Sequence, residues 1–438
     1  MARGRRADGA AVAAADGPLL WTADADFAST DLFGPVAAGR LFLVERPLVP
    51  RSRGRSPAVS CLDTATGRRS WSAPLDIPSP FELRKVAVSG SVAMVRTQGA
   101  LRAFDVRTGR QLWRRNRNTT GSRSTTVTIG DGLAYDSGED ENAADSVTPY
   151  TVHAYEPGGG RLRWTASVRP RAATATAPIH AAGLLLAAAT ANRGGADTAF
   201  VYALDAVTGR QRWARPVAQG YAWPPLVTLS YAENTVFVSL NGRALYALDS
   251  ATGTVRWRSA FELRADGGRG DRGGDGPTGA DVPVAAGDTV YLCGADGVLR
   301  AFDARDGRER WAHPLGEEPS AVRAVPARPR PIVGNGLVYV TSRGTPANDF
   351  ASDVHVLGAD DGRLRWRRPS GGTLMAGGAL HVSDRTAVTA YDPVGGAVLR
   401  RLDLRALGVD GTTELVADDA RLYVLCPPLV LALSLRDR

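Results

Sequence analysis

The sequence predicts an all-β protein, a closed β-propeller of four-stranded blades. Three observations predict this fold: a turn-and-tryptophan phrase that recurs along the chain, short apolar strands before each phrase, and one phrase divided between the two chain ends. A repeat of this length is typical of solenoids, propellers and related arrays. Each unit contains several short antiparallel strands and no expected helix.

The phrase is clearest in residues 247–257, ALDSATGTVRW, where an acidic residue precedes a glycine by four positions and a tryptophan by eight. The first position is occupied by Asp63, Asp105, Glu156, Asp205, Asp249, Asp303, Gly358 and Asp392. The matching glycines are Gly67, Gly109, Gly160, Gly209, Gly253, Gly307, Gly362 and Gly396. The tryptophans are Trp71, Trp113, Trp164, Trp213, Trp257, Trp311 and Trp366, with Arg400 as the one replacement.

Each phrase has the chemistry of a tight hairpin turn. The aspartate can accept backbone N–H groups, and the glycine supplies the positive φ that a bulged hairpin loop requires. The strand before the turn, such as residues 245–248 (LYAL), is apolar on both faces. Such a strand belongs in a sheet that is covered on both sides. Single units cannot bury these faces alone, so the units must stack.

The chain ends indicate that the stack closes into a ring. Residues 13–21, AAADGPLLW, match the second half of the phrase and contain Trp21, whereas residues 431–435, LALSL, match the first half. Pairing of the N- and C-terminal strands would complete the last blade and protect the sheet edges. The raw count is nine units.

Composition agrees with one large β domain at residues 13–438, preceded by a flexible tail at residues 1–12. The chain has 438 residues, 44% of them hydrophobic, with 49 glycines and 27 prolines. Residues 265–281 are expected to form a disordered loop between strands, because they are rich in glycine and charge. Residues 136–145, DSGEDENAAD, are interpreted as a solvated loop, with a weak Ca²⁺ site as the alternative.

The formal net charge of +8 raises the possibility of nucleic-acid binding. The basic residues, nearly all arginine, are scattered through every unit instead of forming one stripe with aromatics, which argues against a nucleic-acid partner. Attraction for acidic partners or anionic surfaces stays open. We expect a monomer with a protein partner or surface ligand.

The cysteines and the N-terminal residues bear on metal binding and on where in the cell the protein is located. Cys61, Cys293 and Cys426 are too far apart for a CxxC metal pair and are odd in number. No apolar run follows the basic N-terminus, so we expect a cytoplasmic protein, or an extracytoplasmic one if the chain is a fragment of a membrane-anchored protein. The uncharged stretch at residues 172–192 has membrane length, but its position and composition favour strands.

The search for catalytic groups finds none that we can assign. The histidines, which are His153, His180, His313, His355 and His381, have no metal-ligand spacing. The aspartates occupy turn positions, and no nucleophile elbow, phosphate loop or dinucleotide fingerprint is present. We therefore expect no enzyme activity, no cofactor and no metal site.

The repeat resembles that of the PQQ-like β-propellers, as in Ala203-Leu204-Asp205 through Gly209 to Trp213. It is similar to repeats of PQQ-dependent alcohol dehydrogenases, of the assembly factor BamB and of propeller domains attached to bacterial Ser/Thr kinases. The resemblance implies eight blades, which we expect over the raw count of nine. It also implies that each register tryptophan, Trp21 included, docks between neighbouring blades. The dehydrogenase family carries a vicinal cysteine pair that this chain lacks.

Trp223 is the one tryptophan outside the repeat register, and it lies near Tyr221 in the stretch QGYAWPPL. Core packing and cofactor stacking remain open for it, but exposed Trp and Tyr side chains are also common binding hot spots. We therefore expect a non-catalytic propeller that acts as an interaction scaffold or ligand-sensing module, with Tyr221 and Trp223 as candidate contacts. The alternatives are a sensor domain related to receptor Ser/Thr kinases and a PQQ-dependent oxidoreductase.

Overall fold

The structure is a computed structural model of the chain. It describes residues 19–24, 33–45, 57–75, 86–97, 99–116, 127–139, 150–168, 174–176, 178–193, 196–221, 227–261, 282–294, 296–316, 330–342, 352–409 and 414–436. These residues form strands and turns, together with one 3₁₀ helix, η3 (Arg405–Leu407). The proposed tail at residues 1–12, the loop at residues 265–281 and Trp223 lie outside the described residues.

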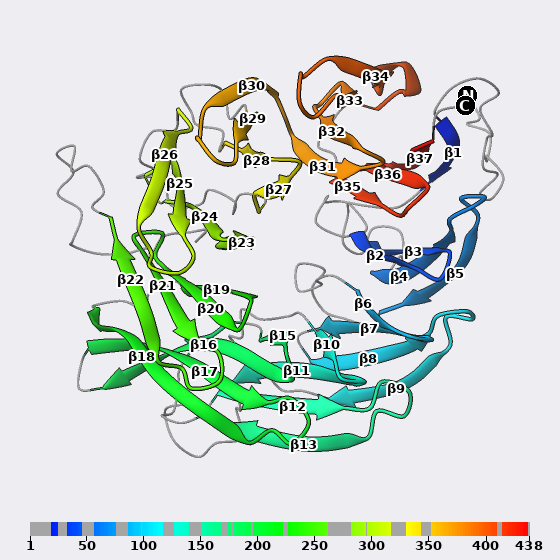
Figure 1. Cartoon of the computed structure of the whole chain (residues 1–438). Helices are drawn as coiled ribbons and strands as arrows, with labels where there is room; N and C mark the ends of the chain where they lie inside the picture. The colour runs from blue at the N-terminus through cyan, green and yellow to red at the C-terminus, as the bar shows by residue number, and fades with distance from the viewer. Residues whose placement is uncertain are drawn as a thin grey trace.

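The strands form antiparallel sheets arranged as blades around a central axis (Figure 1). Blade 1 contains β2 (Phe33–Ala37), β3 (Arg40–Glu45), β4 (Ala58–Asp63) and β5 (Arg69–Pro74). Blade 2 contains β6 (Ala87–Ser89), β7 (Val92–Thr97), β8 (Ala100–Asp105) and β9 (Gln111–Asn116). Blade 3 contains β10 (Thr128–Gly130), β11 (Leu133–Glu139), β12 (Tyr150–Tyr155) and β13 (Leu162–Ser167). Blade 4 contains β14 (Thr174–Ala175), β15 (Ile179–Ala181), β16 (Leu184–Arg193), β17 (Ala196–Asp205) and β18 (Gln211–Tyr221).

The second half of the chain continues the ring. Blade 5 contains β19 (Val227–Ala232), β20 (Thr235–Leu240), β21 (Ala244–Asp249) and β22 (Val255–Ala260). Blade 6 contains β23 (Val284–Ala286), β24 (Thr289–Cys293), β25 (Val298–Asp303) and β26 (Glu309–Pro314). Blade 7 contains β27 (Ile332–Gly334), β28 (Leu337–Thr341), β29 (Asp353–Gly358) and β30 (Leu364–Pro369). Blade 8 contains β31 (Gly372–Ala376), β32 (Ala379–Ser383), β33 (Ala387–Tyr391) and β34 (Val398–Asp403).

Blade 9 closes the ring with strands from both ends of the chain. It contains β35 (Glu414–Ala417), β36 (Arg421–Cys426), β37 (Leu429–Ser434) and β1 (Leu19–Asp24). Strand β1 pairs with β37, so that Trp21 lies opposite Ala432. The N-terminal strand therefore completes the last blade, as the divided phrase predicts.

The number of blades differs from the number that the family resemblance implies. The described residues form nine sheets, so the raw count of nine units is correct and the expected eight blades are wrong. Each phrase forms its own hairpin and each blade needs one phrase. The blade number therefore follows the repeats in this chain.

The turn between the third and fourth strands has the expected chemistry in each fully described blade with an Asp phrase. In blade 5, Asp249 Oδ1 accepts hydrogen bonds from the N–H groups of Ala251 and Thr252 and from the Thr252 hydroxyl. The Gly253 N–H donates to the Asp249 carbonyl at 2.8 Å, and Gly253 has a φ of 69°. A short local sequence thus specifies the hairpin without help from the rest of the fold.

The register tryptophans join neighbouring blades. Trp213 of blade 4 lies on Gly253 of blade 5, and its Nε1 donates to the Ser250 carbonyl at 2.8 Å. The same contact, in which an indole ring lies on a glycine of the next blade, is made by Trp21, Trp71, Trp113, Trp164, Trp213, Trp257, Trp311 and Trp366. The predicted docking role of these residues agrees with this packing. Only glycine leaves room for the ring, because a Cβ on Gly253 would lie 2.6 Å from it.

We expect Gly253→Ala to lower the free energy of unfolding by roughly 1–3 kcal/mol more than Gly287→Ala, the range for overpacking a filled interior. Both glycines have positive φ, so backbone strain is common to both variants. Only Gly253 meets a ring, since a Cβ on Gly287 has no atom within 4 Å. Urea unfolding of the two variants measures the difference. Equal losses would mean that the tryptophan contact does not select glycine.

The stretch at residues 172–192 forms strands, as the sequence analysis predicts. Its described part contributes β14, β15 and most of β16 to blade 4. No helix in the described ranges has the length and apolar character needed to cross a membrane.

Candidate interaction face

The two faces of the ring carry different connections. Because the strands are antiparallel, the connections between first and second strands and between third and fourth strands emerge on one face, the turn face. These connections are all short, for example residues 38–39, 64–68 and 250–254. The remaining connections emerge on the opposite loop face and include the long segments 46–57, 75–86, 140–149, 261–283, 315–331 and 342–352. The long connections, whose lengths differ from blade to blade, are therefore concentrated on the loop face. Loops of this kind on a rigid scaffold are the usual location of binding residues.

Blade 4 extends further toward the loop face than its neighbours. Strands β16, β17 and β18 contain 10, 10 and 11 residues, whereas no other strand in the described ranges exceeds 7. The pairing continues to the far end, where Asn192 lies opposite Asp197 and Asp197 lies opposite Tyr221. These strands are green in Figure 1. We call the part of blade 4 formed by residues 189–200 and 215–221 the blade 4 extension.

The outer edge of the blade 4 extension is unsuited to pairing with another strand. Two extra register shifts occur between Asp197 and Phe200 on β17, and Pro216 lies on β18 opposite Phe200. Bulges and edge prolines are devices that block the addition of a further strand.

Buried contacts hold the base of the blade 4 extension against blade 3, where Ala189 and Phe200 of the extension share a buried apolar cluster with Tyr150. The Tyr150 hydroxyl donates to the Thr176 carbonyl at 2.9 Å, and the Thr176 N–H donates to the Ala188 carbonyl at 2.8 Å. Burial raises the pKa of Tyr150 well above its usual range, so this hydroxyl keeps its proton and remains a donor. Phe200, which is buried, packs on Tyr202 with ring centroids 5.9 Å apart. The base of the extension is thus rigidly supported.

A buried ion pair lies at the neighbouring junction of blades 2 and 3. Arg96 at the end of β7 and Asp136 on β11 are 1% and 0% exposed, and Arg96 Nη1 lies 3.3 Å from Asp136 Oδ2. The interpretation of residues 136–145 as a solvated loop is wrong at its start, because β11 continues through Glu139 and buries Asp136 and Ser137. No motif in the sequence marks this pair, whose partners are 40 residues apart.

The structure places the two candidate contacts only in part. Tyr221 is the last residue of β18 and lies at the tip of the blade 4 extension. Trp223 follows it and lies outside the described residues, so their proximity to each other stays a prediction. The structure adds the position of Tyr221, at the loop-face end of β18, which is the longest strand in the described ranges.

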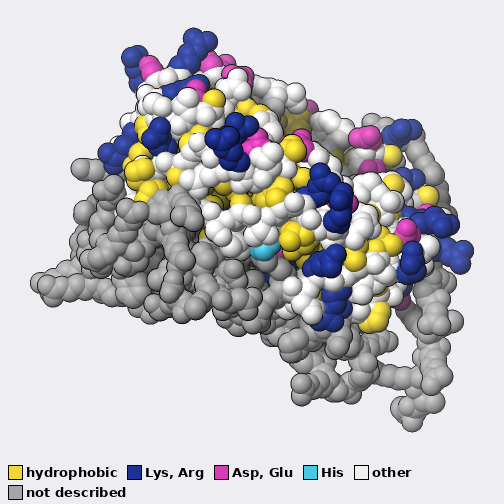
Figure 2. Space-filling view, turned by 90° about the horizontal axis from the view of Figure 1, so that it is seen from below, with side chains coloured by type: hydrophobic (Ala, Val, Ile, Leu, Met, Phe, Trp, Pro, Cys, Tyr) yellow, Lys and Arg dark blue, Asp and Glu magenta, His cyan; other side chains and the backbone are white. Residues whose placement is uncertain are grey.

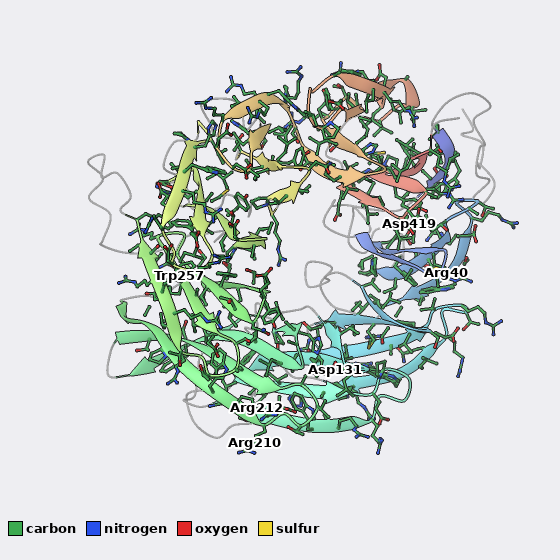
Figure 3. The ribbon with its side chains drawn as sticks, in the orientation of Figure 1. Arg40, Asp131, Arg210, Arg212, Trp257 and Asp419 are labelled. Carbon is green, nitrogen blue, oxygen red and sulfur yellow. The ribbon has the colours of Figure 1, made fainter. Side chains whose placement is uncertain are left out.

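The acidic residues of the turn face are engaged by the turns themselves. In blades 4, 5 and 6, an arginine on the fourth strand lies 2.6 Å from the turn aspartate of the same blade; the pairs are Arg212–Asp205, Arg256–Asp249 and Arg310–Asp303. The Thr208 hydroxyl and then the Arg212 guanidinium lower the pKa of Asp205 to about 2. Arg212 is labelled with Arg210 on the outer part of blade 4 in Figure 3. In Figure 2 the basic side chains of the visible face are dispersed among acidic and apolar ones.

The histidines and cysteines do not assemble a metal centre in the described part of the chain. His180 lies 2.9 Å from Asp131 across blades 3 and 4, and the rings of His313 and His355 are 6.1 Å apart. The three cysteines are buried and are not in disulfide bonds. No group of three or more His, Cys, Asp or Glu side chains that could hold a metal ion occurs in those ranges.

Comparison with known proteins places these features in context. A family model described as outer membrane protein assembly factor BamB matches residues 6–194, 99–222 and 197–374. BamB of Burkholderia pseudomallei is 24% identical over 350 residues, which are 74% of this chain and 85% of that protein. The Ser/Thr kinase AfsK of Streptomyces coelicolor is 30% identical over 287 residues; the match covers 54% of this chain but only 31% of the kinase.

A solved enzyme shares the fold. Quinohemoprotein alcohol dehydrogenase from Comamonas testosteroni superimposes with a TM-score of 0.55 at 14% identity, covering 96% of this chain and 77% of that chain. At this level of identity the likeness concerns the fold alone. The proteins that resemble this chain thus include an assembly factor, a kinase and a dehydrogenase. The function of this chain therefore has to be argued from its own candidate site and not from its fold.

Proposed function

Because the chain belongs to the PQQ-like β-propeller family, we propose that it is a non-catalytic scaffold that binds a protein partner through its loop face, at the tip of the blade 4 extension. The observation that carries the proposal is the length of β17 and β18, whose loop-face ends belong to the blade 4 extension, with Tyr221 as the last residue of β18. Blade 3 supports the base of this extension through the hydrogen bond from Tyr150 to Thr176. A rigid base suits protein recognition, because little conformational entropy is lost on binding, and Tyr221 and Trp223 are the contacts that we propose for it.

The similarity to BamB supports this reading, since that relative is named as an assembly factor and matches over 85% of its length. A second candidate function is the sensing domain of a receptor kinase, favoured by the 30% identity to part of AfsK. The alternative that the chain is an oxidoreductase is supported by the fold that it shares with the alcohol dehydrogenase. No group of described residues supports this alternative.

We expect Trp223→Ala to weaken capture of the partner by at least about tenfold, the effect of losing a binding hot spot. The measurement is a pull-down from lysate and envelope of the native host, followed by titration of the purified partner. Val207→Ala is the control, because Val207 is 61% exposed on the turn face of the same blade. Unchanged binding by Trp223→Ala, or an equal loss in both variants, would contradict the proposed face.

A separate assay addresses the oxidoreductase alternative. The protein is incubated with PQQ and Ca²⁺, and dye-linked oxidation of primary alcohols is followed. Turnover would replace the scaffold proposal with an enzymatic one.

A further inference from the structure

Blade 5 carries two exposed arginines beside the blade 4 extension. Arg243 lies in the connection between β20 and β21, which emerges on the loop face, and Arg258 lies on β22. Val217 of the extension shares a buried apolar cluster with Ala244 and Tyr246 of blade 5. Arg243 directly precedes Ala244 in the chain, and Arg258 lies opposite Tyr246 in the sheet. Both arginines therefore adjoin the extension on the side of blade 5.

Contacts within blade 5 order both arginines. The Arg258 guanidinium lies over the Tyr246 ring, with its Cζ 5.4 Å from the ring centroid. This cation–π contact holds the guanidinium in place. The Arg243 N–H donates to the Leu240 carbonyl at 2.9 Å, and the Arg243 carbonyl accepts from the Phe261 N–H at 3.1 Å, so its backbone is fixed. Binding these arginines therefore costs less conformational entropy than binding freely moving side chains.

The carboxylates of blades 4 and 5 lie on the opposite face. Among the side chains that the structure describes in these two blades, the carboxylates are Asp205, Glu233 and Asp249, and all three lie at the turn face. Two of them are also ion-paired there, Asp205 with Arg212 and Asp249 with Arg256. The described side chains on the loop-face side of these blades thus carry positive charge with no carboxylate of either blade among them.

We propose that the partner of the loop face presents an acidic segment, whose carboxylates bind Arg243 and Arg258 beside the blade 4 extension. This inference rests on the proposed function, because it names the chemistry of the partner at the same face. A guanidinium binds a carboxylate through two parallel hydrogen bonds, and the net charge of +8 attracts an acidic segment from a distance. Two arginines on one blade suit a short segment, whereas a nucleic acid is bound along a longer basic stripe.

Charge reversal tests this chemistry. The probe is a fluorescein-labelled peptide of alternating glutamate and serine, and its binding is followed by fluorescence anisotropy at low and high salt. We expect Arg243→Glu combined with Arg258→Glu to weaken binding at low salt by roughly tenfold, because two attractive contacts become repulsive. The difference should shrink at high salt, since exposed charges are screened.

Arg110→Glu combined with Arg210→Glu is the matched control. Both residues are exposed on the turn face, and this double variant changes the net charge by the same amount. It should retain most of the binding at low salt. An equal loss in the two double variants, or no binding of the peptide to the unaltered protein, would overturn the proposal.

Two other probes represent other anionic partners. Vesicles that contain phosphatidylserine and a labelled single-stranded DNA are titrated with the same variants. A larger loss on reversal of Arg243 and Arg258 with either probe than with the peptide would assign this surface to a membrane or to a nucleic acid. Either result would overturn the proposal of an acidic protein segment.

Titration of the protein captured in the pull-down separates this inference from the proposed function. If Trp223→Ala weakens its binding but reversal of Arg243 and Arg258 does not, the scaffold proposal is supported and the acidic segment is wrong. If only the charge reversal weakens binding, the acidic segment is supported and the contact at the tip is wrong. If neither change weakens binding, both proposals are overturned.

Discussion

Deletion of residues 1–22 is expected to lower the free energy of unfolding by at least about 3–5 kcal/mol, the range for truncating a buried tryptophan. The deletion removes Trp21, which is 2% exposed and whose Nε1 donates to the Thr64 carbonyl of blade 1 at 2.9 Å. It also removes most of β1 and leaves the edge of β37 unpaired. Thermal and urea unfolding of the shortened chain measure the loss.

Deletion of residues 1–9 is the control for this experiment. It leaves all of β1 in place, so its melting temperature should match that of the full chain. Unchanged melting after deletion of residues 1–22 would contradict closure of the ring by the N-terminal strand.

Arg96→Met is expected to destabilise the protein by about 3–5 kcal/mol, because it removes a guanidinium that lies 3.3 Å from the fully buried Asp136 carboxylate. Arg256→Met is the matched control, since Arg256 and Asp249 form an exposed pair at 2.6 Å. Loss of an exposed pair costs about 1 kcal/mol or less. Urea unfolding of both variants gives the comparison.

A double variant separates the ion pair from general packing. Arg96→Met combined with Asp136→Leu replaces both charges with apolar groups and should recover most of the lost stability. A loss from Arg96→Met no larger than that from Arg256→Met would mean that Asp136 does not depend on Arg96. The pair would then have no special role at the junction of blades 2 and 3.

Some features of the fold could be predicted because they depend on neighbouring residues. Asp249, Thr252 and Gly253 form their hairpin turn by hydrogen bonds that span three or four residues. The phrase can therefore be recognised wherever it occurs in the chain. The expectation of eight blades was wrong because it was taken from the related propellers. In this chain each phrase forms one hairpin, so the number of blades follows the number of phrases.

The candidate site could be predicted only in part. Trp223 was singled out because it departs from the repeat, but nothing in the phrase indicates that the preceding hairpin is the longest. The uncharged run that includes β16 could have indicated the long strands of blade 4, because an ordinary blade strand contains fewer apolar residues. Asp136 was predicted to lie in a solvated loop because the residues that follow it are rich in Asp and Glu. Its burial could not be predicted, because its partner Arg96 lies in another blade.

The sequence by itself determined the turns, the tryptophan register, the nine repeat units and the pairing of the chain ends, since each follows from local hydrogen bonding or from counting a repeat. The expected number of eight blades was wrong, and the structure decided it. Only the tertiary structure decided which side chains meet across blades: Arg96 with Asp136, Tyr150 with Thr176, and Arg400 with Ser434. These contacts depend on the distance and angle between sheets that are far apart along the chain. That geometry is set by the packing of the whole ring and leaves no local pattern.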